Sequence, residues 1–231
     1  MSQAASATAI LVLARWPTAS MVWGLKELAW GALVPTKAPG LRWRKVLGSG
    51  YQGGFGLRPG WDRLAQFCVF DDARSARAWL EHDRGLAAWR DRAADLLWFE
   101  LRAWQCRGRW AGQDLPVSTG APDTGPVAAL TRASIRPSQA RAFWSHSPAA
   151  ERALAASAGC SLAVGLGEAP LLRQATFSLW SGLDAMDAYA RSGAHLEAIR
   201  DAYRQGYFSE SMFARFVVTD RGGSWNSLRA H

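Results

Sequence analysis

The segment GRWAGQDLPVSTGAPDTGP, residues 108–126, divides the 231-residue chain nearly in half. It is rich in Gly, Pro, Asp, Ser and Thr, and Pro116, Gly120, Pro122 and Gly125 are typical of turns and irregular backbone. The hydrophobic pattern indicates the same order of elements on each side of this segment. We therefore predict two similar halves that are joined by a loop or linker.

Alternating and helical patterns predict six elements in each half. In the first half they are a strand at 9–15, a helix at 20–32, strands at 41–47 and 64–70, a helix from 73 and a strand at 97–106. In the second half they are a strand at 127–135, a helix at 138–156, strands at 161–166 and 173–180, a helical pattern over 183–204 and a strand at 212–219. Each half reads βαββαβ, the arrangement of ferredoxin-like domains. The predicted fold is α+β, with a ferredoxin-like half at 1–112, a linker at 113–125 and a second ferredoxin-like half at 126–231.

Composition restricts the partners. The 13 Trp and the formal net charge of +8 suit nucleic acid, an anionic membrane surface or a cofactor with carboxylates and an aromatic face. Nucleic-acid binding needs a clustered basic stripe, but the arginines are scattered among acids, so we expect no nucleic-acid partner. Three separated cysteines without a CxxC pair favour a reducing, cytoplasmic compartment and argue against structural zinc.

No run of about 18 apolar residues predicts a membrane-spanning helix. The longest apolar candidate, 21–35, is interrupted by Lys26 and Glu27. An ordinary amphipathic helix is the simpler interpretation, and peripheral contact with a membrane surface is the alternative. Common catalytic motifs such as GxSxG, HExxH and GxxxxGK are also missing, and the glycine-rich stretch 50–56 reads as a flexible loop.

His195 is the histidine that the pattern turns toward the interior. Helical spacing puts it on one face with Ala198 and Ile199, and Ser192 can cap that helix. The positive end of the helix favours a neutral imidazole, which can bind iron. On these residues alone, a hydrogen-bonded core histidine is the simpler interpretation and an iron ligand is the alternative. The other histidines are His82 in a charged stretch, His146 before a proline and His231 at the chain end.

Two arginines interrupt apolar strands. Arg215 shares a strand face with Phe213 and Val217, and Arg132 lies in a similar run. A buried guanidinium needs an anionic partner, for which a haem propionate or an oxygen species would serve. An ion pair with a nearby carboxylate, such as that of Glu168 or Glu210, is the alternative.

Several segments taken together resemble the spheroidene monooxygenase family, whose members oxidise acyclic carotenoids in purple bacteria. The segments are PGLR (39–42), KVLG (45–48), LTRASIR (130–136), GLGEAP (165–170), QATFSLW (174–180), HLEAIR (195–200), GYFSE (206–210) and GSW (223–225). Their order is specific, and the similarity is densest after residue 126.

The resemblance implies a haem-dependent monooxygenase that uses oxygen and electrons from a ferredoxin. It implies hydroxylation at carbon 2, near one end of the carotenoid, followed by a second hydroxylation that yields a ketone. The layout is also similar to the dimeric α/β barrel haem proteins, in which the axial histidine lies on a helix of the second half and an arginine lies on the next strand. His195 and Arg215 match that plan.

From the residues and the resemblance together, we expect His195 to bind the haem iron and Arg215 and Arg132 to be catalytic. The expected haem contacts are His195, Ala198, Ile199, Arg215 and Phe177. The expected partners are an apolar substrate, a ferredoxin-type donor and, at the surface, a membrane or a second copy of the chain. The rival hypotheses are a haem-dependent dehydratase, a dismutase of a small oxyanion similar to chlorite dismutase, a non-catalytic haem or carotenoid carrier, and a ferredoxin-like dimer without cofactor.

Overall fold

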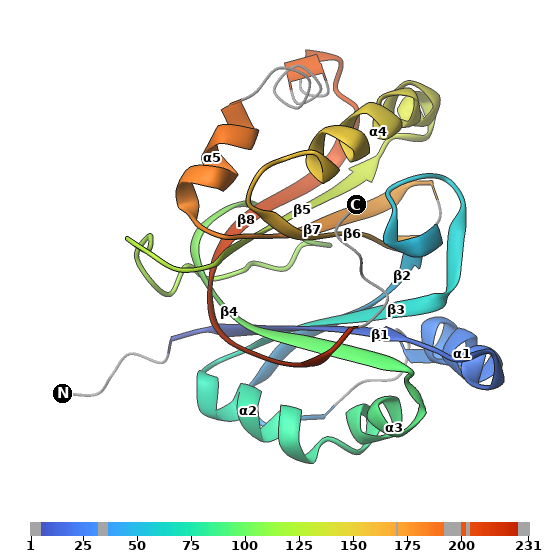
Figure 1. Ribbon diagram of the computed structural model, residues 1–231, viewed down its shortest axis with the longest axis vertical. Coiled ribbons are helices and arrows are strands. Elements are labelled where there is room, and N and C mark those ends of the chain that lie inside the picture. The colour runs from blue at the N-terminus through green and yellow to red at the C-terminus, as the bar shows by residue number, and fades with distance from the viewer. Residues whose placement is uncertain (1–5, 32–36, 170, 192–199, 202–203, 226–231) are drawn as a thin grey trace.

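The computed structural model describes residues 6–31, 37–169, 171–191, 200–201 and 204–225. Eight antiparallel strands form a closed barrel in the order β1-β3-β2-β6-β7-β5-β8-β4, and the helices lie on its outside (Figure 1). The predicted α+β class is confirmed. A single chain closes the barrel.

The elements follow the predicted order. The first half contains β1 (Thr8–Arg15), α1 (Met21–Gly31), β2 (Leu41–Gly50), β3 (Pro59–Phe70), α2 (Ala73–His82), α3 (Arg84–Arg92) and β4 (Asp95–Gly108), with short 3₁₀ turns η1 (Thr18–Ser20) and η2 (Tyr51–Gly53). The second half contains β5 (Val127–Ile135), η3 (Pro137–Gln139), α4 (Ala140–Ala155), β6 (Cys160–Ala169), β7 (Arg173–Trp180), α5 (Leu183–Arg191) and β8 (Phe208–Ser224). The helix predicted from residue 73 is two helices, because the Asp83 carboxylate caps α3 by accepting from the Leu86 N–H at 2.8 Å.

The two halves meet at two unequal seams. Their strand orders are β4-β1-β3-β2 and β8-β5-β7-β6, so β4 joins β8 and β2 joins β6. The β4–β8 ladder runs from Leu96 opposite Ser224 to Gly108 opposite Met212. The β2–β6 ladder has two residue pairs, Gly48 with Gly167 and Ser49 with Leu166. One seam is therefore long and closed, and the other is short.

Side chains fill the barrel interior. Alternate residues of all eight strands point inward, among them the fully buried Leu11, Phe67, Phe99 and Phe216. Trp110 enters from the segment between β4 and β5, where its ring stacks on that of Phe67 with centroids 5.6 Å apart. The irregular segment that the sequence predicts as a loop or linker therefore also contributes to the core.

The helices cover the outer faces of the two sheets, α1, α2 and α3 over the first half and α4 and α5 over the second (Figure 1). Under the first three helices lies a continuous apolar cluster that includes Trp16, Trp79 and Trp89. No helix within the described residues is long and apolar enough to span a membrane.

Candidate functional site

A cavity of about 610 Å³ lies between the sheet of the second half and the helices that cover it. This volume is in the range of pockets that bind a cofactor or a drug-sized ligand. The described residues that line it are Phe55, Arg107, Gly108, Thr131, Arg132, Ala133, Phe143, Trp144, Ser147, Ala150, Gln174, Ala175, Thr176, Ala190, Tyr207, Phe208, Ser211, Met212, Phe213 and Arg215.

The floor of the cavity is the outer face of strands β5, β7 and β8. Residues two apart on a strand share a face, so Thr131 and Ala133 of β5 point outward while Leu130 points into the barrel. Thr176 stands opposite Thr131 on β7. Between β5 and β7 the floor thus carries small side chains and hydroxyl groups, which leave the space above it open, whereas β8 adds Phe213 and Arg215.

The roof comes from α4, with one residue from α5. Phe143, Trp144 and Ser147 of α4 face the cavity, as does Ala190 of α5. Two hydrogen bonds hold α4 in place: Trp144 Nε1 donates to the Leu171 carbonyl at 2.9 Å, and Ser147 Oγ donates to the Phe55 carbonyl at 3.0 Å. The second bond ties α4 to the loop of the first half, so both halves contribute to the cavity.

Arg215 is the cationic group of the floor. Its guanidinium lies 3.0 Å from Asp187 Oδ1 of α5 and 5.5 Å from the centre of the Phe213 ring. The carboxylate partner is therefore Asp187, and the alternatives named from the sequence, Glu168 and Glu210, belong to another arginine. Arg215 Nε is buried and has no hydrogen-bond partner among the described residues. The positive charge of Arg215 at the cavity floor favours an anionic group in the cavity.

Arg132 borders the same cavity but its guanidinium is committed elsewhere. The side chain is 2% exposed and turns toward Trp110, with the guanidinium 5.8 Å from the ring centre. It forms ion pairs with Glu168, at 3.0 Å, and with Glu210. Arg132 therefore has carboxylate partners, which the sequence analysis gave as the alternative to a bound anionic ligand.

The two glutamates are held in their charged forms. Burial alone would raise the pKa of Glu168, but the nearby Trp110 ring N–H, Arg132 and Lys45 together outweigh it and the pKa is lowered. For Glu210, burial also raises the pKa, but hydrogen bonds from the backbone N–H groups of Gly112 and Ala111, together with Arg132, lower it. The cluster is therefore a network of paired charges at the edge of the barrel interior.

The remaining predicted haem contacts have different outcomes. Phe177 is fully buried on the inner face of β7, where its ring lies 5.3 Å from that of Phe99, and it does not contribute to the cavity wall. His195, Ala198 and Ile199 lie outside the described residues. Among the described residues, no group of three His, Cys, Asp or Glu side chains could hold a metal ion.

Sequence reasoning missed the aromatic residues of the roof. Phe143 and Trp144 were assigned only to a helix, and Phe55 to a glycine-rich loop. Their signal was present: two adjacent aromatics at the start of a helix that otherwise contains mostly Ala, Ser and charged residues. That signal does not say which sheet the helix covers.

No protein-family model matches the chain. Among solved structures, an aldoxime dehydratase in complex with butyraldoxime is similar with a TM-score of 0.59 and 12% identity, over 95% of this chain and 81% of that one. A second aldoxime dehydratase structure gives a TM-score of 0.57, also with 12% identity, over 93% of this chain and 81% of that one. At such low identity this similarity concerns the fold alone.

Two relatives are far more similar in sequence. A spheroidene monooxygenase of Rubrivivax gelatinosus is 47% identical over 220 residues, covering 95% of this chain and 85% of the relative. A spheroidene monooxygenase of Rhodobacter capsulatus is 35% identical over 213 residues, covering 90% of this chain and 88% of the relative. With this identity along nearly its whole length, the chain belongs to the spheroidene monooxygenase family and is a monooxygenase.

Proposed function

We propose that this protein is a haem-dependent carotenoid monooxygenase. In this proposal it hydroxylates an acyclic carotenoid at carbon 2, near one end, and oxidises the product on to the ketone, using oxygen and a ferredoxin-type electron donor. Membership of the family supports the reaction class. The observation that carries the proposal is the cavity of about 610 Å³ with a half-buried arginine, Arg215, on its floor.

The residues around the cavity fit a haem. Phe143, Phe208 and Phe213 offer flat apolar surface to a macrocycle and to an apolar substrate, and they exclude water. Arg215, whose guanidinium lines the cavity, suits a propionate carboxylate, which an arginine binds with more than one donor. When bound, haem supplies the redox chemistry of oxygen activation.

In this proposal His195 would bind the haem iron, and Ala198 and Ile199 would contact the haem. His195 follows Ala190, which lines the cavity, by five residues, a span of at most about 18 Å of extended chain. One protein side chain can hold a haem iron, so a cluster of several metal ligands is not required. The division of the chain into ferredoxin-like halves at 1–112 and 126–231 belongs to the same proposal, with the haem in the second half.

The partners follow from charge and chemistry. A protein of net charge +8 attracts an acidic ferredoxin, and a basic surface with exposed aromatic residues suits contact with the membrane that holds a carotenoid. Turnover must therefore depend on a reduced donor. Turnover without any electron donor would instead favour a dehydratase or a dismutase.

The absorption spectrum of the purified protein tests the haem and its ligand. We expect a Soret band that His195→Ala weakens or shifts and that added imidazole restores. His146→Ala is the matched control, because that histidine lies in α4 between the cavity-lining Trp144 and Ser147. A spectrum unchanged by His195→Ala would remove His195 from the role, and a band lost only in His146→Ala would reassign it. Protein whose spectrum after haem is added stays that of free haem would refute the proposal.

A further inference from the structure

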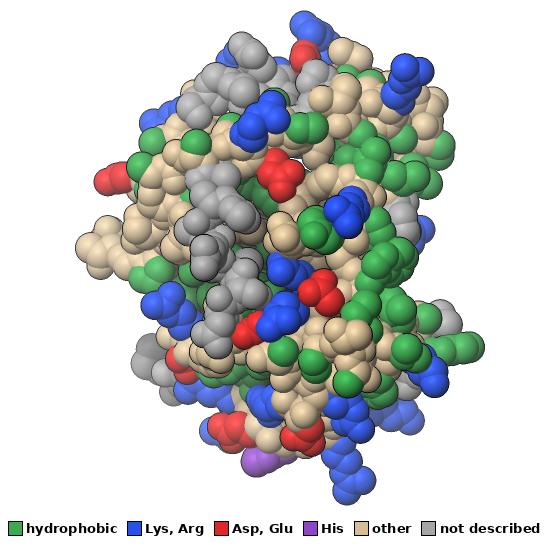
Figure 2. All heavy atoms as spheres, turned by 45° about the vertical axis from the view of Figure 1, so that its right-hand side comes forward, with side chains coloured by type: hydrophobic (Ala, Val, Ile, Leu, Met, Phe, Trp, Pro, Cys, Tyr) green, Lys and Arg blue, Asp and Glu red, His purple; other side chains and the backbone are tan. Residues whose placement is uncertain are grey.

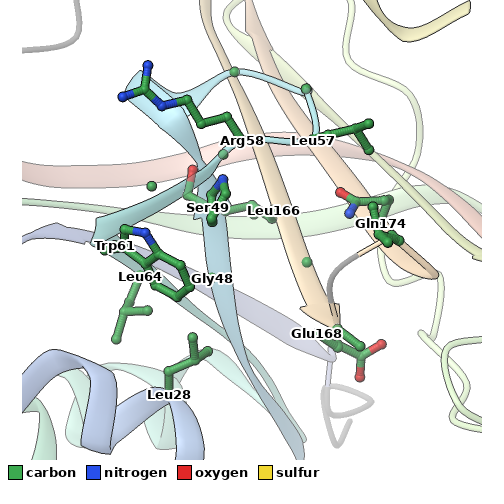
Figure 3. Close-up of a pocket in the computed structure, with 18 of the residues that line it drawn as sticks. Leu28, Gly48, Ser49, Leu57, Arg58, Trp61, Leu64, Leu166, Glu168 and Gln174 are labelled. Atoms are coloured by element: carbon green, nitrogen blue, oxygen red, sulfur yellow. The ribbon is translucent and has the colours of Figure 1, made fainter. Parts of the chain in front are cut away.

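A second hollow lies along the short β2–β6 seam, on the boundary between the two halves (Figure 3). It holds about 120 Å³ and is bounded by α1, the ends of β2 and β6, the loop after η2 and the start of β3. In the close-up, Leu28, Trp61 and Leu64 lie on one side of the seam and Gln174 and Glu168 on the other (Figure 3). We call this hollow the seam groove.

Glycines create the groove. Gly48 and Gly167 stand opposite each other at the seam, so no side chain covers the ladder there. A Cβ on Gly48 would lie 3.5 Å from Leu28 Cδ2, an ordinary contact, and a Cβ on Gly56 would meet nothing within 4 Å. The floor of the groove is therefore open because of residue size, and a larger side chain could fill it.

The walls of the groove expose large apolar side chains. Trp61 is 56% exposed, Leu57 58% and Leu171 46%. Hydrophobic side chains gather on this side of the molecule, above and below the junction of the halves (Figure 2). Exposed apolar surface next to a hollow is typical of a binding site. Arg58 does not obstruct the groove, because its guanidinium stacks over the Tyr51 ring at 3.8 Å.

The seam groove lies next to the cavity, and the two share part of their walls. Trp144 and Gln174 line both of them. Leu171, at the mouth of the groove, holds Trp144 through its carbonyl. A ligand that extends out of the cavity past Trp144 and Gln174 would therefore enter the groove between the halves.

The size of the two spaces indicates what the groove holds. A cavity of about 610 Å³ that contains a porphyrin has room for one end of a long apolar molecule, but not for all of it. The groove is too small for a ring system of any bulk but has the apolar lining that a narrow, extended chain needs. The carotenoid of the proposed function is such a chain.

We propose that the seam groove binds the distal part of an acyclic polyene chain whose reacting end lies in the cavity. The inference rests on the proposed function, since it takes the substrate class from it. The seam groove adds a site that selects substrates by their length and by the absence of a bulky ring at the end far from the reacting carbon. The selecting residues are Gly48, Leu57, Trp61 and Leu171.

Equilibrium binding tests the groove. Spheroidene, the compound in the relatives' name, would be titrated in detergent micelles into the purified full-length protein, and quenching of tryptophan fluorescence and the shift of the carotenoid absorption would be followed. A ten-carbon acyclic isoprenoid alcohol serves as the short probe, detected by displacement of spheroidene. We expect Gly48→Leu, which fills the floor, and Trp61→Ser, which removes a wall, each to weaken spheroidene binding by about tenfold or more. Binding of the short probe should not change.

Two controls separate the groove from folding and from surface adsorption. Gly48→Ala adds only the Cβ, for which the structure has room, and should bind nearly as the wild type does. Trp30→Ser removes a tryptophan that is 63% exposed on α1 and does not line the groove, and it should leave spheroidene binding unchanged. A Soret band of normal intensity in all variants reports an intact haem site.

The outcomes are distinct. Wild-type binding that neither Gly48→Leu nor Trp61→Ser weakens would overturn the groove while leaving the proposed function intact. Equal weakening by Trp61→Ser and Trp30→Ser would also overturn it, in favour of adsorption to the surface. A wild-type protein that binds neither spheroidene nor the short probe would refute the substrate class and the groove together, whereas the haem proposal is read separately from the spectrum.

Discussion

The two halves of the barrel share a strand plan, yet one is closed under its helices and the other is hollow. Leu11 pairs with Phe67 in the first half as Leu130 pairs with Phe177 in the second, which sets the structural equivalence. One position further along, Val12 of the first half corresponds to Thr131, whose hydroxyl faces the cavity.

The helices above these sheets differ in the same way. Under α1 and α3, the Trp16 ring lies 5.2 Å from those of both Trp23 and Trp89, edge to face, within the buried apolar cluster of the first half. Under α4 and α5, the buried apolar cluster is small, and alanines such as Ala150 and Ala190 face the hollow. The size of the side chains beneath the helices thus fills the space under one sheet and leaves a cavity over the other.

We expect the largest difference in stability between the two halves when an aromatic ring is removed from each of them. Trp89→Ala should cost about 3–5 kcal/mol of unfolding free energy, because it empties a fully packed space. Trp144→Ala, at the wall of an existing cavity, should cost less than about 2 kcal/mol, because little further packing is lost. Urea unfolding of both variants measures the difference. Equal losses would mean that the hollow half is as tightly packed as the closed half.

A second contrast concerns position 132. The residue equivalent to Arg132 in the first half is Leu13, since Leu13 pairs with Ala65 as Arg132 pairs with Ala175. Arg132→Leu gives the second half the residue that the first half has at this position. It also removes the cation that Glu168 and Glu210 share. We expect a loss of about 2 kcal/mol, less than for a fully buried pair, since Glu168 keeps Lys45 and Glu210 is partly exposed. Adding Glu168→Gln and Glu210→Gln to Arg132→Leu should restore much of it.

Acid unfolding checks the same network. Both glutamates have folded-state pKa values below their ordinary values, so protons bind more tightly to the unfolded chain. Their contribution to stability is complete above the unfolded pKa of about 4.3 and is lost as the pH falls through the folded pKa. The triple variant should lose less stability than the wild type on acidification. An identical pH profile would show that Arg132 does not stabilise these carboxylates.

The sequence predicts the strands and the α+β class well, because short apolar runs such as β1 and alternating segments such as β7 can both be recognised from neighbouring residues. β7 occupies the predicted residues 173–180, and the order of elements is correct throughout. What periodicity cannot supply is which distant group each side chain meets. Arg132 and Arg215 look alike in their strands, yet one turns to Trp110 inside the barrel and the other to Asp187 under α5.

The candidate site is predictable only in part, because periodicity does not show which distant groups a side chain meets. Arg215 was expected near an anionic ligand from its apolar strand, and it lies on the floor of the cavity. Phe177 was expected there too, but a one-residue step along a strand reverses the face, so it fills the barrel. Trp110 shows a further limit, since a segment rich in Gly and Pro predicts a loop but not that one of its side chains enters the core.

The smallest expected effect on stability comes from adding a phenyl ring to each half. Ala76 of α2 is fully buried in the packed cluster of the first half, and Ala150 of α4 lines the cavity of the second. Ala76→Phe should lower the unfolding free energy by about 1–3 kcal/mol, because the ring has no space to enter. Ala150→Phe should leave stability almost unchanged, because its ring enters the hollow.

Function should respond in the opposite order. Ala150→Phe takes up part of the space that a haem or a substrate end would occupy, so haem uptake, followed by the Soret band, should fall sharply, while Ala76→Phe protein that remains folded should take up haem as the wild type does. If Ala150→Phe destabilised the protein as much as Ala76→Phe, the hollow would not accept a ring and the second half would be closed like the first. If it were stable and still bound haem fully, the hollow would be real but the haem would lie elsewhere. Stability and spectrum together therefore separate the existence of the cavity from its use.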